Sequence, residues 1–292
     1  MNNLSIIILT RNEEVHIKRC LESVKGFCKD VFIVDSNSTD KTMDIAKKYT
    51  ANISTGDFNT FSEKLNWAIE NLPIKTTWSM RLDADEILTD GFKKEIHSSL
   101  GGLSNKINGV YLRRQLWFMN RWMRYGGMYP IYSMRIWRTK EAFCEDRALD
   151  EHMLLKRGES IKFNLDIIDN PLSLINKWVD KHNEYSDLEV ISYFDNDKSK
   201  IIWLKLFDNQ EARKRWLKNI FYRKIPLFIR PFMYFFYRYI FCLGFLDGKK
   251  GFIWHVLHAF YYRFLIDVKI YETIEKSTKS QETIKKKHKN ET

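Results

Sequence analysis

In the first 83 residues, continuous apolar runs alternate with segments whose apolar residues have helical spacing. This alternation predicts strands and helices in succession. Continuous apolar runs are typical of strands that are buried on both faces of a parallel sheet. Such strands are expected at 4–10, 30–35, 51–55 and 76–83. The segments between them carry apolar residues at helical spacing, the first of them at Val15, Ile17, Leu21 and Val24. Strands that alternate with helices predict an open α/β sheet built of βαβ units.

Capping residues mark where the predicted helices begin. Ser38, Thr39 or Asp40 caps the second helix. Thr60 and Glu63 form a capping box for a third helix that reaches residue 70.

Beyond residue 100 the pattern changes. The segments 109–119 and 132–139 alternate like strands, and a Gly-rich, mobile loop over 120–130 is expected to join them. A further helix is expected over 173–194.

Charge and aromatic content divide the chain at residue 200. Residues 1–200 contain 29 basic and 29 acidic side chains, whereas the remainder contains 19 Lys and Arg against 8 Asp and Glu. The same remainder holds 21 of the 43 aromatic residues. The sequence therefore predicts a neutral α/β domain over 1–200, a basic, aromatic, amphipathic helical region over 201–272, and a Lys-rich disordered tail over 273–292.

The aromatic region is interpreted as a membrane-surface element. Its longest charge-free stretch within 221–246 is eight residues, whereas a membrane span needs about 20 mostly apolar residues. We expect interfacial helices with aromatic side chains among the acyl chains and basic side chains on anionic headgroups, at Arg223, Lys224, Arg230 and Arg238. An internal helical subdomain is the alternative. Nucleic acid is not expected as a partner, because no segment resembles an RNA-binding motif.

The cysteines and the N-terminus indicate the compartment. Cys20, Cys28, Cys144 and Cys242 form no CxxC pair and no metal-ligand spacing, so we expect free thiols in a reducing compartment. The first residues lack the basic segment of a signal peptide and lead directly into a strand. The protein is therefore expected on the cytoplasmic side of any membrane that it meets.

Three acids crowd into four positions at the end of the strand 76–83. Asp83, Asp85 and Glu86 repel one another at this spacing, so they need open water or a neutralising partner. One interpretation is a solvated turn before a helix that Thr89 caps. The other is a ligand site, because open α/β sheets bind ligands beyond the carboxyl ends of their strands.

Three motifs, in this order and spacing, resemble those of the inverting family 2 glycosyltransferases with a GT-A fold: LSIIILTRNEE, VFIVDSNSTDKT and RLDADE. Two later segments are similar to bacterial members of that family that build lipopolysaccharide, O-antigen and capsule: WVDKHNEYSDLEV and YRYIFCLGFLDGKKGFIWHVLHAFYYRFLIDVKIYE. The resemblance covers essentially the whole chain. It implies an α/β fold of the GT-A type, Rossmann-like with a mostly parallel open sheet, followed by a helical, membrane-associating region.

The resemblance also implies a nucleotide-sugar donor and a divalent cation, Mg²⁺ or Mn²⁺, which offsets the diphosphate charge as the glycosidic bond breaks. Asp85 is implied as the direct metal ligand, and Asp83 would face the ribose or reach the metal through water. Glu86 is interpreted as structural, turning back to cap the next segment.

The base pocket is implied at the other strand ends. By resemblance Asp35 contacts uracil or ribose, with an ordinary N-cap run as the alternative, and Thr10, Arg11 and Glu13 line the pocket. Lys64 stands where relatives hold a basic residue near the diphosphate, with a solvated helix lysine as the alternative.

Inverting transfer also needs a base that takes the proton of the acceptor hydroxyl. The acid-rich segment 145–154 offers the candidates. Asp150 stands where the family more often has the His of a His-Glu pair, so Glu151 is the first candidate and Asp150 the second. His152 is expected to contact the metal or the diphosphate, with a structural role as the alternative.

Together these features imply an inverting, metal-dependent hexosyl- or N-acetylhexosaminyl-transferase. It would move a sugar, most simply from UDP, to a lipid-linked glycan in surface polysaccharide biosynthesis, at the cytoplasmic face of the inner membrane. Two other functions are considered. One is a non-catalytic nucleotide-binding membrane scaffold, and the other is a transferase acting on polyprenyl phosphate.

Overall fold

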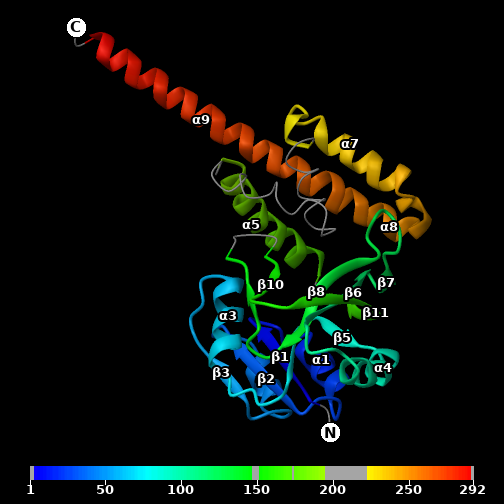
Figure 1. Ribbon diagram of the computed structural model, residues 1–292. Coiled ribbons are helices and arrows are strands. Elements are labelled where there is room, and N and C mark those ends of the chain that lie inside the picture. The colour runs from blue at the N-terminus through cyan, green and yellow to red at the C-terminus, as the bar shows by residue number, and fades with distance from the viewer. Residues whose placement is uncertain (1–2, 147–150, 173, 195–221, 291–292) are drawn as a thin grey trace. The chain divides into compact units, whose positions relative to one another are not determined.

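The computed structural model describes residues 3–146, 151–172, 174–194 and 222–290 (Figure 1). The chain divides into two compact units, Met1–Ser173 and Leu174–Thr292. The sequence places this boundary at residue 200 instead. The difference arises because the helix expected over 173–194 packs against the C-terminal helix of the second unit.

Nine strands form one sheet within the described residues of the first unit, in the order β3-β2-β1-β4-β8-β6-β11-β5, with β7 paired to β6. Their bounds are β1 (Leu4–Thr10), β2 (Asp30–Asp35), β3 (Ile53–Thr55), β4 (Trp78–Asp83), β5 (Glu86–Leu88), β6 (Ile107–Phe118), β7 (Arg121–Trp122), β8 (Ile131–Arg138) and β11 (Glu159–Asp169). A separate two-stranded sheet consists of β9 (Ala142–Cys144) and β10 (Met153–Leu155).

The parallel part of the sheet is the part that the apolar runs predict. Strands β3, β2, β1 and β4 are mutually parallel, and every residue of β1 is buried. The remaining strands make the sheet mixed, because β8 runs antiparallel to both β4 and β6, whereas β11 runs parallel to β6. From these directions, the last residues of β1, β2, β4, β6 and β11 all meet at one edge of the sheet.

Helices cover both faces of this sheet. The first unit contains α1 (Ile17–Val24), α2 (Thr42–Ala46), α3 (Phe61–Asn71) and α4 (Asp90–Gly101). One core cluster joins α1, α2 and α4 to the sheet, and a second joins α3, β9 and β10 to the opposite face. Successive residues of β1 point alternately into the two clusters, which is why this strand reads as a continuous apolar run.

The predicted caps are found in part. Thr60 accepts from the backbone N–H of Glu63, and Thr89 accepts from that of Phe92. Of the three candidates for the second helix, Asp40 accepts from the N–H of Thr42. One residue of the first apolar stripe is misplaced: α1 begins only at Ile17, so Val15 precedes it and is exposed.

The second unit is helical. Its elements are α5 (Ile175–Phe194), η2 (Tyr222–Lys224), α7 (Arg230–Phe236), η3 (Tyr237–Phe241), η4 (Gly244–Asp247), α8 (Gly248–His255), η5 (Val256–Tyr261) and α9 (Tyr262–Asn290). Tyr262, Ile266 and Ile270 of α9 form its buried core with aromatic residues of α5. No helix in the described ranges has both the length and the hydropathy of a membrane crossing.

Two expectations for this region differ from the structure. α9 continues to Asn290, so the stretch after residue 272 is helical rather than disordered. Its Lys and Glu residues favour helix, and the Lys276–Glu272 pair adds an i,i+4 contact of 2.7 Å. Arg230 does not face headgroups either, because it is buried and pairs with Asp267 at 2.5 Å. Part of the expected interfacial region, 201–221, lies outside the described residues.

Three histidines are enclosed in the helical unit. The ring of His182 stacks on Trp178 at 3.6 Å, and that of His258 stacks on Trp254 at 4.9 Å. Burial lowers the pKa of His182 and of His255 to about 4, and burial together with Arg263 and Arg238 holds the pKa of His258 well below its ordinary value. These rings are therefore neutral in the folded protein at neutral pH.

This enclosure predicts a loss of stability in acid. An unfolded histidine binds a proton below about pH 6.5, whereas the folded rings resist protonation down to about pH 4. The stability that depends on neutral rings is complete above pH 6.5 and is lost as the pH falls toward 4. We expect the thermal midpoint, followed by circular dichroism, to fall by several degrees from pH 7.5 to pH 5. His182→Gln should show a smaller fall; an identical fall in both proteins would contradict the assignment.

Candidate active site

The first part of the site is a hydrogen-bonded pair at the ends of β1 and β2. Thr10 and Asp35 are register partners, and the Thr10 hydroxyl donates to Asp35 Oδ1 at 2.6 Å. Asp35 also accepts from the backbone N–H of Ser38 at 2.7 Å and from its hydroxyl at 2.6 Å. Thr10 and Asp35 therefore lie side by side at these two strand ends. The contacts to Ser38 are those of an N-cap run, which was the alternative interpretation of this segment. They hold the Asp35 carboxylate in place before any ligand binds.

The loops after these two strands are fastened to each other. Asn12 adopts a φ of 56° and accepts from the backbone N–H of Thr39 at 2.8 Å. The backbone N–H of Glu13 donates to the hydroxyl of Thr42 at 2.7 Å, and the Glu13 carboxylate lies 2.7 Å from Nδ1 of His16. Arg11 is exposed beside this junction. The loop that the resemblance assigns to the base pocket therefore has a defined backbone.

Lys64 reaches this pair from α3. It is buried, which excludes the solvated-lysine alternative, and its Nζ donates to the backbone carbonyl of Thr10 at 2.6 Å. Burial lowers the pKa of Lys64 to about 8, although the nearby Asp35 carboxylate acts in the other direction. The ammonium is therefore charged at neutral pH and stands next to the two strand ends.

The acids at the end of β4 are neutralised by arginine. Arg135 on β8 is only 2% exposed; its guanidinium contacts Asp83 at 3.1 Å and Glu86 at 2.5 Å. Arg81 donates twice to the same Asp83 carboxylate, at 3.0 and 3.1 Å. Burial alone would raise the pKa of Asp83, but the two guanidinium charges hold it below its ordinary value. Burial raises the pKa of Glu86, and the neighbouring acids add to this effect.

Two expectations about this turn are corrected. The partner of Asp83 and Glu86 is an arginine from a distant strand, so the turn is not simply solvated. Glu86 also turns back to the preceding residues rather than to the next segment, since its Oε2 accepts from the backbone N–H of Asp83 at 2.9 Å.

Asp85 lies between these two acids in the turn and is half-buried. Its backbone carbonyl accepts from Arg19 at 3.1 Å, and Arg19 also donates to the carbonyl of Asn170 at 2.6 Å. These bonds tie the turn to α1 and to the end of β11. Within the described residues, no three His, Cys, Asp or Glu side chains gather as a protein-only metal cluster.

The acid-rich segment is carried by the β9–β10 hairpin. Asn66 of α3 holds β9 through both of its amide atoms, donating to the carbonyl of Cys144 at 2.9 Å and accepting from its N–H at 2.7 Å. The carbonyl of His152 accepts from the N–H of Glu145 at 2.8 Å and closes the hairpin. Glu151 is half-buried beside it. Asp150 lies outside the described residues.

Arg81 links this hairpin electrostatically to the end of β4. Burial raises the pKa of the Cys144 thiol to about 11; Arg81 opposes the rise, whereas Glu151 adds to it. Both side chains therefore lie within electrostatic range of one thiol, and Arg81 also contacts Asp83. The structure brings the acid-rich segment and the β4 acids to the same neighbourhood.

A second cluster of hydrogen bonds lies at this edge, and the sequence analysis does not predict it. Asp166 on β11 accepts from Arg113 at 2.7 Å, from Gln115 at 2.8 Å and from the Tyr129 hydroxyl at 2.9 Å. Tyr129 packs edge-on against Trp122 at 4.9 Å. The Gly-rich segment 120–130, expected to be mobile, is therefore held to the sheet by these contacts.

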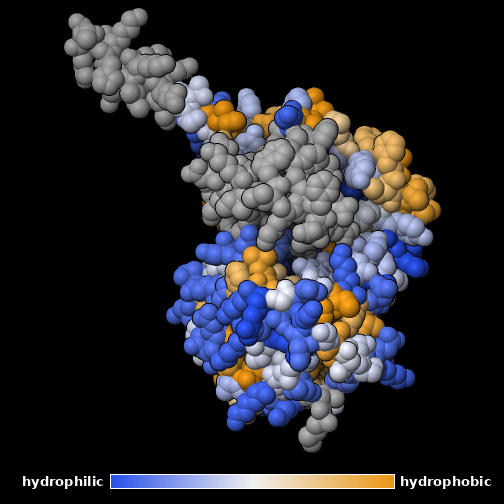
Figure 2. Space-filling view, viewed as in Figure 1, coloured by the Kyte–Doolittle hydropathy of each residue, from blue (hydrophilic) through white to orange (hydrophobic). Residues whose placement is uncertain are grey.

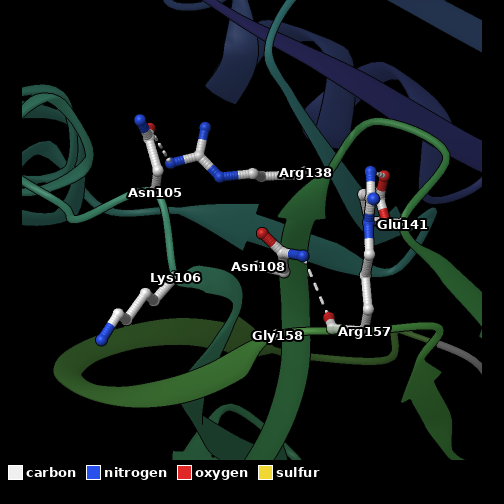
Figure 3. A pocket seen from close by; sticks show the side chains of 7 residues that line it. All are labelled: Asn105, Lys106, Asn108, Arg138, Glu141, Arg157 and Gly158. Carbon is white, nitrogen blue, oxygen red and sulfur yellow. Dashed lines mark hydrogen bonds and ion pairs between the residues drawn. The ribbon is translucent and has the colours of Figure 1, made fainter.

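A hollow lies at the opposite edge, where β6 and β11 begin and β8 ends (Figure 3). It has a volume of about 410 Å³. Its arginines are already engaged, since Arg138 donates to the carbonyl of Ile107 at 2.9 Å and Arg157 pairs with Glu141 at 2.6 Å. None of the predicted site residues lines it, so we assign the chemistry to the other edge.

The Arg135 cluster yields a stability prediction. Arg135→Met leaves Glu86 without its ion-pair partner and Asp83 with Arg81 alone. Breaking a buried ion pair in this way typically costs about 3–5 kcal/mol in the free energy of unfolding. We expect urea denaturation to show a loss of that size. Arg157→Met removes an arginine whose side chain is 78% exposed and should have little effect.

A double variant tests the cause. Adding Glu86→Gln to Arg135→Met removes the orphaned charge and should restore part of the loss. If the stability losses of the two single variants simply add in the double variant, the charge argument is wrong.

Two curated glycosyltransferases match part of the chain. An uncharacterized glycosyltransferase of Rickettsia typhi is 34% identical over 96 residues, which are 33% of this chain and 32% of that protein. The lipopolysaccharide core biosynthesis glycosyltransferase LpsC of Rhizobium meliloti is 30% identical over 120 residues, 38% of this chain and 42% of that protein. The chain thus spans less than half the length of these relatives.

Two solved structures resemble the chain at lower identity. TarS 1-349 of S. aureus in complex with UDP-GlcNAc is 15% identical with a TM-score of 0.47, covering 96% of this chain and 92% of that chain. Glucosyl-3-phosphoglycerate synthase from Mycobacterium tuberculosis in complex with Mg²⁺ and UDP is 18% identical with a TM-score of 0.34, covering 39% of this chain and 44% of that chain.

The family comparison identifies one part of the chain. The model named Glycosyl transferase family 2 matches residues 5–141, from β1 through β8. The match includes Thr10, Asp35, Lys64 and the acids that follow β4, whereas the acid-rich hairpin turn lies just beyond it. Residues 5–141, just under half of the chain, are therefore similar to glycosyl transferase family 2.

Proposed function

We propose that the protein is an inverting glycosyltransferase that takes a hexosyl or N-acetylhexosaminyl group from a nucleotide donor. The observation that carries the proposal is the meeting of Thr10, Asp35, Asp83 and Asp85 at one sheet edge, inside the segment that matches glycosyl transferase family 2. Ligands of open α/β sheets bind beyond this edge.

The nucleotide is assigned to the ends of β1 and β2. The Thr10–Asp35 pair offers a carboxylate with fixed orientation to the base or ribose. The Lys64 ammonium adds a positive charge beside them and is available to offset the charge of a diphosphate. Both solved structures described above are complexes with UDP or a UDP-linked sugar, and we adopt UDP as the first donor nucleotide to test.

A divalent cation, Mg²⁺ or Mn²⁺, fits the donor set at the end of β4. Such cations take oxygen ligands and are commonly bound through one or two carboxylates plus substrate phosphates. Asp83 contacts Arg81 and Arg135. Asp85, in the turn that follows, is assigned as the carboxylate that holds the metal. The cation would offset the charge that develops on the leaving diphosphate. His152 is kept as a second contact for the metal or diphosphate.

The base is assigned to the acid-rich hairpin turn. Glu151 is the first candidate, since it lies within electrostatic range of Cys144 together with Arg81, whose guanidinium contacts the β4 acids. It would accept the proton of the acceptor hydroxyl as that oxygen attacks the anomeric carbon. Asp150 is the second candidate.

The acceptor is proposed to be a lipid-linked glycan of bacterial surface polysaccharide, either O-antigen, lipopolysaccharide core or capsule. LpsC, named for lipopolysaccharide core biosynthesis, supports this class. An acceptor of this kind places the enzyme at the cytoplasmic face of the inner membrane, as a peripheral protein attached through the basic aromatic region.

The alternative is a nucleotide-binding membrane scaffold without catalysis. Incubation with UDP-, GDP- and dTDP-sugars distinguishes the two functions, because glycosyltransferases slowly hydrolyse their donors. We expect release of sugar from a UDP-linked donor. Nucleotide binding without hydrolysis of any donor, even with glycolipid extract present, would favour the scaffold. Transfer to polyprenyl phosphate alone would favour the other enzyme class.

The metal assignment predicts the effect of one substitution. Asp85→Asn keeps the shape of the side chain and removes the charge that holds the cation, so donor hydrolysis should fall by about 10²-fold or more. Calorimetry should show that Mn²⁺ no longer strengthens UDP binding to this variant. Wild-type hydrolysis that persists in excess EDTA would rule the metal role out.

The base assignment predicts a separation of binding from catalysis. Glu151→Gln should lower transfer by about 10²–10⁴-fold while UDP affinity stays unchanged. Glu145→Gln, at the other side of the same hairpin turn, is the matched control and should retain activity. If Glu151→Gln transfers normally, the role passes to Asp150, which the corresponding Asp150→Asn variant tests.

A further inference from the structure

The helical unit contains a segment whose large apolar residues point outward. We define the apolar tip as Phe236, Ile240, Phe241, Leu243, Phe245 and Leu246, between the end of α7 and the end of η4. Each of these side chains is more than 40% exposed, and Phe241 reaches 78%. Figure 2 shows hydrophobic surface gathered over α7 and the turn that follows it. Contiguous exposed apolar surface of this kind marks an interaction site.

The tip is exposed because glycines and an acid occupy its inner side. A Cβ on Gly244 would lie 2.5 Å from Nε2 of His255, and one on Gly251 would lie 2.4 Å from Cβ of Asp247. Asp247 itself is 1% exposed. Leu243 adopts a φ of 60°, which turns the chain sharply into η4. The turn thus packs its small residues inward and leaves no room inside for its large ones.

The charges around the tip have one sign. Lys249 and Lys250 begin α8 and are exposed, and Arg238 lies within η3. Between Tyr237 and His255 the sequence has a single acid, the buried Asp247, so this segment carries a net positive charge. Apolar side chains flanked by lysines complement a bilayer surface that carries anionic headgroups.

We propose that the apolar tip inserts into the headgroup region of an anionic lipid bilayer, with Lys249 and Lys250 on the lipid phosphates. This inference narrows the proposed membrane attachment from the whole region 201–272 to one turn. It also changes the role of the arginines, since Arg230 pairs with Asp267 inside the unit. It rests on the proposed membrane location but makes no use of the transfer reaction.

Vesicle sedimentation of the full-length protein tests the tip. We expect binding to phosphatidylethanolamine vesicles that contain phosphatidylglycerol, and weak binding to pure phosphatidylcholine. The double variant Phe241→Ser, Leu246→Ser should lose more than tenfold in partition to the anionic vesicles. Ile274→Ser removes a comparably exposed apolar side chain from α9 and should bind as the wild type does. Equal loss in both variants would overturn the proposal.

The lysines are tested by a second pair of variants. Each basic residue near an anionic surface is worth about 1 kcal/mol at low salt, so Lys249→Gln with Lys250→Gln should weaken binding roughly 30-fold and flatten its salt dependence. Lys47→Gln with Lys48→Gln removes two adjacent exposed lysines of the first unit and should change little. Unchanged binding in the first variant would overturn the charge part of the proposal.

Other outcomes identify other occupants. A wild-type protein that ignores the vesicles, or that is a dimer disrupted by Phe241→Ser, would assign the tip to a protein contact and overturn the lipid assignment. Donor hydrolysis, measured in the same variants without vesicles, should be unchanged. If the wild-type protein hydrolyses no donor, the proposed reaction is refuted, whereas the conclusion from vesicle binding is unaffected.

Discussion

The placement of Arg135 is the constraint on which the site depends. Three carboxylates in four residues cannot stay together at a strand end without positive charge, and this guanidinium is buried against two of them. A buried pair of this kind adds little net stability compared with an apolar core. It does determine where each acid points. Asp83 and Glu86 are drawn inward to the arginines, whereas Asp85 is half-buried in the turn between them.

The same logic extends along the sheet edge. Asp35 is engaged by Thr10 and Ser38, and Asp166 by Arg113, Gln115 and Tyr129. Each strand end therefore presents a polar group whose orientation is already determined by hydrogen bonds. Such preorganisation lowers the cost of ordering these groups when a charged ligand binds. The edge is accordingly well suited to a ligand with several phosphate and hydroxyl oxygens.

The sequence predicts the parts of this arrangement that depend on local pattern. The four parallel strands follow from apolar runs, and the meeting of Thr10 with Asp35 follows from parallel neighbours that end together. β11 was missed although Ile161, Phe163, Leu165 and Ile167 alternate along it. The pattern also indicates that Arg135 is unusual, because it lies among buried neighbours in an alternating strand. Its partners could not be deduced, because they depend on the pairing of β4 with β8, more than 50 residues apart.

Helix α3 has a mechanical consequence for the reaction path. Lys64 fastens it to the end of β1, and Asn66, two residues later, fastens it to β9. Two residues correspond to about 3 Å of helix rise. The helix therefore sets the spacing between the end of β1 and the acid-rich turn. Because both attachments belong to one helix, a displacement of α3 would carry the end of β1 and the acid-rich turn together and keep their separation.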